Sequence, residues 1–283
     1  MALRLTLPAF PGYSYFRALV AASVAFFFFS MCQLLPGRQS PPLMPWEVQM
    51  HPIETNWAKY DESVPIAIAS VPEDLPVSHT IPGLLAPGDQ GSQSSGTAWA
   101  AGYAAFSHAQ RYKRGQADYI CSPASIFNRL NRGRNQAISI LAALQLLENY
   151  GCPHEKYMPY RENDYVYQPG RLAVEDGERY RVRGYGRVDY QDIEQMKAHL
   201  YQGSVVILRL RISENFVYHR GREWRVPAGQ EVGSQTLVVV GYDEARGVFI
   251  LQNSVGGEWG EYGRTAIPYH WFIRLAEKAY ILW

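Results

Sequence analysis

Cysteine and histidine, which often act as the nucleophile and the base in covalent catalysis, are few in this 283-residue chain. There are seven histidines and three cysteines, and no His, Cys and Asp residues recur at the spacing of a metal site. We therefore expect no metal and no cofactor. A hydroxyl with a base beside it could attack a carbonyl, and the best placed hydroxyls are those of Ser94, Ser95 and Thr97, just before a predicted helix. The thiols belong to Cys32, Cys121 and Cys152.

The elements that must position these groups change from helices to strands along the chain. An alanine-rich segment predicts a helix over 98–112, and further helices over 139–150 and 192–201 are each followed by a glycine. Mixed charges over 161–190 indicate a solvated surface loop. Apolar runs then predict strands at 205–210, 236–240, 248–251, 264–267 and 280–282. Helices first and strands later favour an α+β fold with two lobes.

Charge and composition exclude several classes of protein. The chain has 27 Lys+Arg against 26 Asp+Glu and a formal net charge of +1. This balance excludes nucleic-acid binding that is driven by a positive charge over the whole chain. We expect no nucleic-acid partner. Hydrophobic residues make up 47% and charged residues 19%, which excludes general disorder. Aromatic residues reach 13%, and exposed tyrosines are typical of protein interfaces.

The N-terminal region predicts a membrane anchor. Residues 18–35 form an uncharged run between Arg17 and Arg38, and its 18 residues would reach about 27 Å as a helix, close to the hydrocarbon thickness of a bilayer. We expect an uncleaved transmembrane helix at 18–35. A signal peptide is the alternative, although no small-x-small cleavage site follows. Flanking charges favour a cytoplasmic segment 1–17 and a globular domain on the periplasmic or extracellular side.

Prolines mark the next boundary. Ten of the 18 prolines fall between residues 36 and 87, and proline excludes long helices there. We expect a Pro-rich tether over 36–80 and a globular domain over 81–283.

Six motifs in this domain resemble those of the papain-like cysteine peptidases in content, order and approximate spacing. They are DQGS (89–92), GTAWA (96–100), CSP (121–123), YGCPHEKYMPY (150–160), LVVVGYD (237–243) and QNSVGGEWGEYG (252–263). The resemblance implies a papain-like fold with a helical lobe and an antiparallel β-barrel-like lobe. It also implies structural positions for Cys121 and Cys152, either as one disulfide outside the cytoplasm or as two buried thiols.

The chemistry of that family needs a thiolate at a helix N-terminus, a His to move the proton, an Asn to orient the His and a Gln at the oxyanion. Aligned by Trp99, the nucleophile position is Ala98, and the His position is Gln235. Asn253 is retained but has no imidazole to orient. Gln90 is also retained. However, the span from Gln90 to Trp99 is two residues longer than in the family, so the resemblance does not extend to its place in an oxyanion hole.

These substitutions predict a pseudoenzyme without an intact catalytic set. We expect a non-catalytic, membrane-anchored subunit or scaffold with protein partners, probed best by what co-purifies with it. One alternative is a peptide-binding module that uses the degenerate cleft. Another is a hydrolase whose nucleophile has moved to a nearby hydroxyl; it lacks an evident base, since His219 lies 16 residues before Gln235 in a predicted surface loop.

Overall fold

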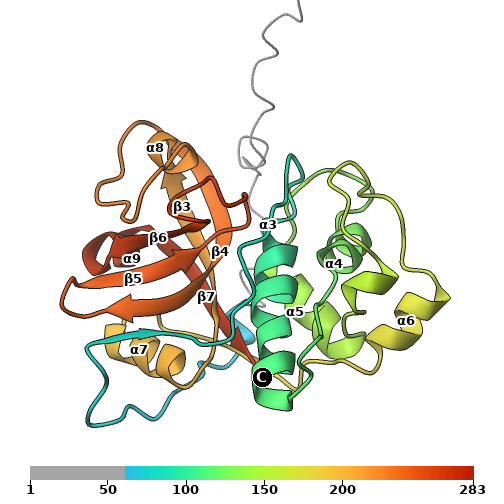
Figure 1. Ribbon diagram of the computed structural model, residues 1–283, viewed down its shortest axis with the longest axis horizontal. Helices are drawn as coiled ribbons and strands as arrows, with labels where there is room; N and C mark the ends of the chain where they lie inside the picture. The colour runs from blue at the N-terminus through green and yellow to red at the C-terminus, as the bar shows by residue number, and fades with distance from the viewer. Residues whose placement is uncertain (1–60) are drawn as a thin grey trace, which may run out of the picture. The chain divides into compact units, whose positions relative to one another are not determined.

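The computed structural model describes residues 61–283, which belong to one compact unit. The predicted anchor at 18–35, the segment 1–17 and the first part of the tether lie outside the described residues. Within 61–283 no helix is both long enough and apolar enough to cross a membrane. Figure 1 shows a mostly helical lobe beside a lobe built on a sheet, which confirms the α+β fold with two lobes.

The helical lobe is arranged around one central helix. It begins as α3 (Gly96–Ala98) and continues in π-helical form as η2 (Trp99–Phe106) and η3 (Ala109–Lys113). The Ser122 and Ser139 side chains cap α4 (Pro123–Leu130) and α5 (Ile140–Asn149) by accepting hydrogen bonds from backbone N–H groups. The helices predicted at 98–112 and 139–150 are therefore confirmed. The loop predicted over 161–190 is wrong in part, because α6 (Arg171–Gly177) forms there.

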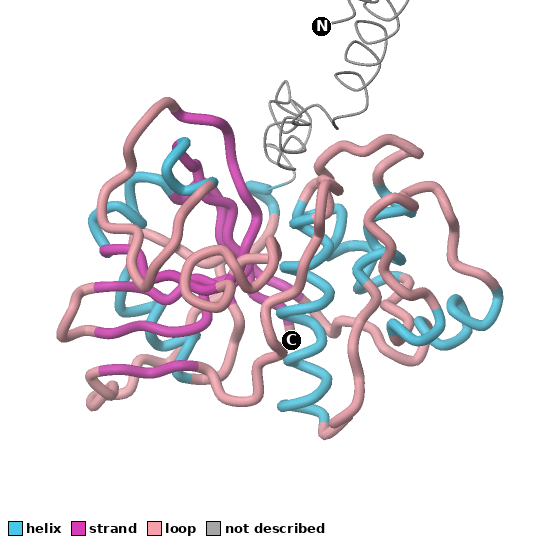
Figure 2. Tube along the Cα trace, turned by 45° about the horizontal axis from the view of Figure 1, so that its top comes forward, coloured by secondary structure: helices cyan, strands magenta, loops and turns pink. Residues whose placement is uncertain are grey.

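The second lobe is an antiparallel sheet with strand order β2-β7-β3-β4-β5-β6. Its strands are β2 (Tyr185–Arg187), β3 (Val206–Ser213), β4 (Glu231–Asp243), β5 (Val248–Gln252), β6 (Arg264–Pro268) and β7 (Ala276–Leu282). The five predicted strands are confirmed, and β2 was not foreseen. Helices α7 (Ile193–Tyr201), α8 (Glu214–Val217) and α9 (Tyr269–Leu275) complete this lobe, as Figure 2 shows.

The described end of the Pro-rich segment packs on the sheet lobe. The Asp61 carboxylate contacts the Lys278 ammonium and the Tyr280 hydroxyl, and the Ala67 N–H donates to Arg187 O at 2.8 Å. Strand β1 (Ser78–Thr80) then pairs antiparallel with the end of β4. Residues 61–80 are therefore held along the sheet by side-chain and backbone contacts.

Two features fix the central helix between the lobes. Small residues, Ala100 and Ala104, line its side towards β4, so the helix and the strand approach closely. On its other side, a disulfide joins Cys121 to Cys152, with a Cα–Cα distance of 5.6 Å. The disulfide connects the start of α4 to the segment after α5, and both cysteines are fully buried.

Candidate functional site

The fold brings the retained and replaced motif residues to the junction of the two lobes. Gln90 precedes the central helix, Gln235 lies on β4, and Asn253 follows β5. Gln90 and Gln235 have no exposed surface, and Asn253 is only 3% exposed. With Ser254 they form what we call the amide cluster.

Hydrogen bonds run through the amide cluster from one residue to the next. The Gln235 Nε2 donates to Asn253 Oδ1 at 3.0 Å and lies 3.3 Å from Gln90 Oε1. The Ser254 hydroxyl donates to the same Gln90 oxygen at 2.7 Å. The sequence suggested that Asn253 has no partner to orient, because the imidazole is missing. In the structure Asn253 does have a partner, since the Gln235 amide donates a hydrogen bond to it.

Two backbone groups fix the direction of these amides. The Ser254 N–H can only donate, and it donates to Asn253 Oδ1 at 2.9 Å, so Gln235 must present its NH₂ group to that oxygen. At the other end the Gln93 carbonyl can only accept, and it accepts from Gln90 Nε2 at 2.9 Å. Gln90 therefore turns its carbonyl oxygen, and not its N–H groups, towards Gln235.

This orientation decides what the amide cluster can do chemically. An oxyanion site needs hydrogen-bond donors aimed at the developing charge, whereas Gln90 offers an acceptor. An amide neither takes up nor releases a proton near neutral pH, so Gln235 cannot act as a general base. The Gln235 Oε1 and the Asn253 Nδ2 are buried and have no hydrogen-bond partner among the described residues.

Ala98, the residue predicted at the nucleophile position, lies elsewhere. It is fully buried and belongs to the hydrophobic core that the helical lobe and the sheet share. Its methyl group carries no atom that could attack a carbonyl.

The hydroxyls near the helix start are already engaged. Thr97 Oγ1 lies 3.0 Å from Ile138 O and 3.1 Å from Thr236 Oγ1, which links the two lobes directly. Ser95 Oγ lies 2.7 Å from the Tyr160 hydroxyl, whose pKa burial raises to about 12. Within residues 61–283 no histidine is hydrogen-bonded to Ser95 or Thr97, so neither hydroxyl has a base.

His219 is held at a separate place on the sheet lobe. Its Nε2 lies 2.8 Å from Thr265 Oγ1 and 3.0 Å from Gly221 O, and its ring packs on Trp259. Burial lowers the pKa of its imidazole. Among the described residues no group of three His, Cys, Asp or Glu side chains is placed to hold a metal ion.

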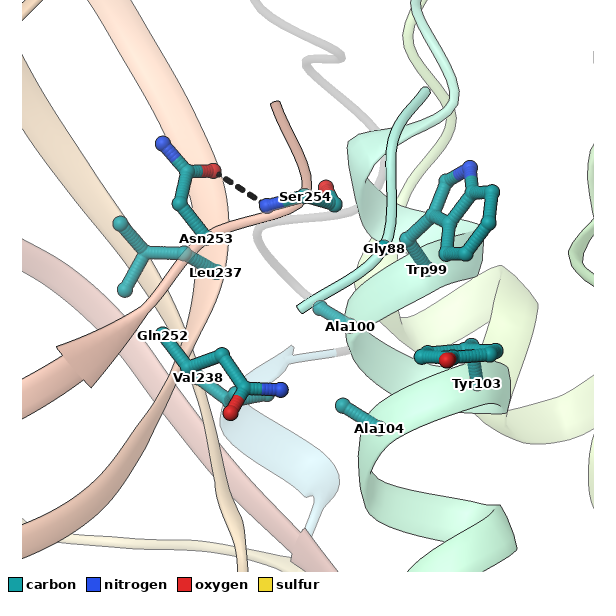
Figure 3. A pocket seen from close by; sticks show the side chains of 10 residues that line it. All are labelled: Gly88, Trp99, Ala100, Tyr103, Ala104, Leu237, Val238, Gln252, Asn253 and Ser254. Carbon is teal, nitrogen blue, oxygen red and sulfur yellow. Dashed lines mark hydrogen bonds between the residues drawn. The ribbon is translucent and has the colours of Figure 1, made fainter. Parts of the chain in front are cut away.

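Below the amide cluster the lobes meet through apolar side chains. Figure 3 shows Trp99 and Tyr103 on the helix side of this junction and Gln252 on the sheet side. We call Ala100, Ala104, Leu237 and Val238 the apolar seam. The cavity that they line with their neighbours has a volume of about 10 Å³, which is enough for about one water molecule.

Sequence reasoning missed the contacts that orient the site. The roles of Ser254 and of the Gln93 carbonyl depend on how the loop before the central helix folds, and no motif signals them. The two extra residues between Gln90 and Trp99 were a usable signal. Because of them, the family's spacing places the nucleophile at one position when it is counted back from Trp99 and at another when it is counted forward from Gln90.

Comparison with known proteins agrees with this architecture. The chain is 26% identical over 216 residues to an uncharacterised peptidase C1-like protein of Acanthamoeba polyphaga mimivirus, covering 69% of this chain and 68% of that protein. The structure resembles xylellain, a cysteine protease from Xylella fastidiosa, with a TM-score of 0.73, 21% identity and coverage of 88% and 98%. It also resembles procathepsin B S9 of Trypanosoma congolense, with a TM-score of 0.67, 16% identity and coverage of 83% and 86%.

A family model extends this likeness to the sequence motifs. The model of the papain family of cysteine proteases matches residues 88–275, which include both halves of the junction between the lobes. On the strength of that match and of the two-lobed fold, the chain belongs to the papain family of cysteine proteases.

Proposed function

We propose that this protein is a non-catalytic member of its family, which acts as a membrane-anchored binding or scaffold subunit of a membrane-associated complex. The amide cluster carries the proposal. Where papain-like chemistry needs a nucleophile, a base and an oxyanion donor, the cluster offers a buried chain of amides that are hydrogen-bonded to one another. No proton transfer is available to such a chain near neutral pH.

The proposal places binding on the outer surface of the domain and not in the cleft. The residues of the amide cluster are buried, and the cavity in the seam below it has space for about one water molecule. The outer surface carries several exposed tyrosines, a residue type that is enriched in protein interfaces. Within residues 61–283, those with more than two fifths of their surface exposed are Tyr112, Tyr150, Tyr157, Tyr167, Tyr201, Tyr218 and Tyr262.

The membrane location is part of the same proposal. The uncharged run 18–35 is the anchor, and the Cys121–Cys152 disulfide favours an oxidising compartment for the domain, on the periplasmic or extracellular side. Its partners are proteins of that compartment or that membrane.

Purification of the full chain from detergent-solubilised membranes tests the proposal. We expect a stoichiometric set of protein partners that remains bound through gel filtration, and no turnover of a mixed fluorogenic peptide library. The matched control is Gln235→Met, which alters only the buried amide cluster and should keep the same partners. A monomer that carries bound peptide, released in the Gln235→Met variant, would instead support the peptide-binding alternative.

The same preparation tests a displaced nucleophile. Peptide turnover by the wild-type chain that disappears in Ser95→Ala or Thr97→Val would overturn the non-catalytic proposal. Because both hydroxyls are buried and hydrogen-bonded to groups that are not bases, we expect no such activity.

A further inference from the structure

The first residue of the central helix, Gly96, faces the amide cluster. It is buried, and a methyl group at its Cα would lie 3.0 Å from Gln90 Oε1, 3.2 Å from Gln235 Nε2 and 3.2 Å from Thr236 O. These distances are shorter than ordinary van der Waals contacts to carbon. Any side chain at this position would thus point directly at the two residues that stand for the base and for the oxyanion ligand.

Ala98 cannot share that direction. Two residues along an α-helix correspond to a rotation of about 200°, so side chains at 96 and 98 leave the helix on nearly opposite sides. This agrees with the place of Ala98 in the hydrophobic core. Only one of the two positions can face the cluster, and it is position 96.

The backbone does not explain why residue 96 is a glycine. Gly96 is absent from the glycines of the described chain that adopt a positive φ, the usual reason for glycine. Glycine also costs stability in a helix relative to alanine. Space is the remaining reason, since the Gln90 and Gln235 amides occupy the volume that a side chain would need.

The spacing of the residues and the form of the central helix both explain where the two extra residues lie. The span from Gln90 to Trp99 exceeds that of the family by two, so the family's spacing, counted forward from Gln90, ends at Gly96 and not at Ala98. Beyond Ala98 the helix is π-helical over Trp99–Phe106 and again over Ala109–Lys113. A π-helix holds more residues in each turn, so it accommodates an insertion without moving the ends of the helix.

We infer that Gly96, and not Ala98, occupies the nucleophile position of this fold, and that Gly96 and Gln235 form a matched pair in which the missing side chain makes room for the amide. Gly96 comes from the central helix and Gln235 from β4, so each lobe contributes one residue of the pair. This inference does not depend on the scaffold role, because it concerns which position faces the cluster, whatever the protein binds.

Two double variants of the full chain test the assignment. Gly96→Cys with Gln235→His places a thiol and an imidazole on the facing positions, and Ala98→Cys with Gln235→His is the matched control. Iodoacetamide is added between pH 5 and pH 9, and mass spectrometry locates the adduct, which separates the new thiol from Cys32. We expect the thiol at 96 to react at pH 6 at least tenfold faster than a free cysteine, since an adjacent imidazolium favours the thiolate. The thiol at 98 should remain unmodified in the folded protein.

Fast modification of residue 98 with a protected residue 96 would overturn the assignment. So would equal rates at the two positions.

Thermal unfolding keeps the inference testable if the cysteine variants do not fold. Gly96→Ala should lower the Tm of the wild-type chain, and the loss should be at least halved in a Gln235→Ala background, where the amide no longer occupies the space. Ala98→Ser, measured in the same two backgrounds, should lower the Tm equally in both. An equal loss for Gly96→Ala in both backgrounds would show that the two residues are not a matched pair.

Discussion

The two ends of the junction between the lobes differ in chemistry. At one end the amide cluster contains only amides and a hydroxyl, joined by hydrogen bonds, with two buried polar atoms left without partners in the described chain. At the other end, in the apolar seam, alanines of the central helix lie beside β4, whose residues Leu237 and Val238 line the cavity between them. Strand β4 contributes to both ends, with Gln235 in the amide cluster and Leu237 and Val238 in the apolar seam.

This difference separates what holds the fold together from what determines its chemistry. Burial of apolar surface is the main favourable term in folding, and a typical hydrogen bond adds only about 1 kcal/mol net. The family fold can therefore persist while the residues of the amide cluster change, as long as the apolar seam and the disulfide remain. Function resides in such sites and not in the fold that carries them.

Truncation of the buried side chain of Leu237, which borders the apolar seam, should have the largest effect. Leu237 is 2% exposed and lies on the same strand as Gln235, two residues away and therefore on the same face. Leu237→Ala should lower the free energy of unfolding by about 2–5 kcal/mol, through lost burial and the cavity left behind. Urea unfolding of the full chain in detergent, followed by tryptophan fluorescence, measures it. A loss below 1 kcal/mol would mean that the buried Leu237 side chain adds little to the stability of the core.

Removal of the disulfide should follow closely. Cys121 and Cys152 are 31 residues apart, and a closed loop of that size constrains the unfolded chain. Replacing both by alanine should cost about 2–4 kcal/mol of the free energy of unfolding, measured in the same way. Dithiothreitol should destabilise the wild-type chain by a similar amount and leave the double variant unchanged. If dithiothreitol affects both proteins equally, its effect does not come from this disulfide.

The pH dependence of stability should come from the body of the helical lobe and not from the amide cluster, which has no group that titrates near neutral pH. Burial and then the nearby Lys113 lower the pKa of His108 to about 4. Between about pH 6.5, the unfolded pKa, and pH 4, His108 binds a proton in the unfolded chain but not in the folded chain. The free energy of unfolding therefore decreases as the pH is lowered from about 6.5 to 4. The loss should not exceed about 3 kcal/mol.

His108→Phe, which retains a ring beside Tyr112, is the matched variant for this measurement. The free energy of unfolding, measured from pH 7 to pH 4, should fall less steeply in His108→Phe than in the wild-type chain. Identical slopes would assign the pH dependence to other groups, such as His199, whose pKa is also lowered by burial.

Much of the fold could be predicted because local signals agreed with it. The α5 helix has its Ser139 cap, its apolar spacing and the Gly151 that follows, and the long strands are rich in β-branched residues. The α6 helix could not be predicted, since its N-cap is Gly170, without a capping side chain, and most of its residues are exposed. Its inner face consists of three buried residues, Ala173, Asp176 and Gly177.

The site was predictable in part, for a physical reason. Motif order was enough to bring Gln90, Gln235 and Asn253 together, because each lies at a fixed place on a strand or beside the central helix. The direction of the Gln90 amide was not predictable, because the Gln93 carbonyl sets it through a contact within an irregular loop. The nucleophile position was assigned by alignment on Trp99 alone. Such an alignment does not take into account the two extra residues between Gln90 and Trp99.

The smallest effect should come from Gln235→Met, which removes the amide while keeping a side chain of similar length. No acceptor is left without a donor, because Asn253 Oδ1 keeps the Ser254 N–H and Gln90 Oε1 keeps the Ser254 hydroxyl. The variant also removes the buried Gln235 Oε1, which has no partner within the described residues. Two lost hydrogen bonds and one relieved desolvation penalty nearly cancel, so the free energy of unfolding should change by less than about 1 kcal/mol. A loss as large as that of Leu237→Ala, two residues further along β4, would show that the Gln235 amide contributes as much to stability as the buried Leu237 side chain does.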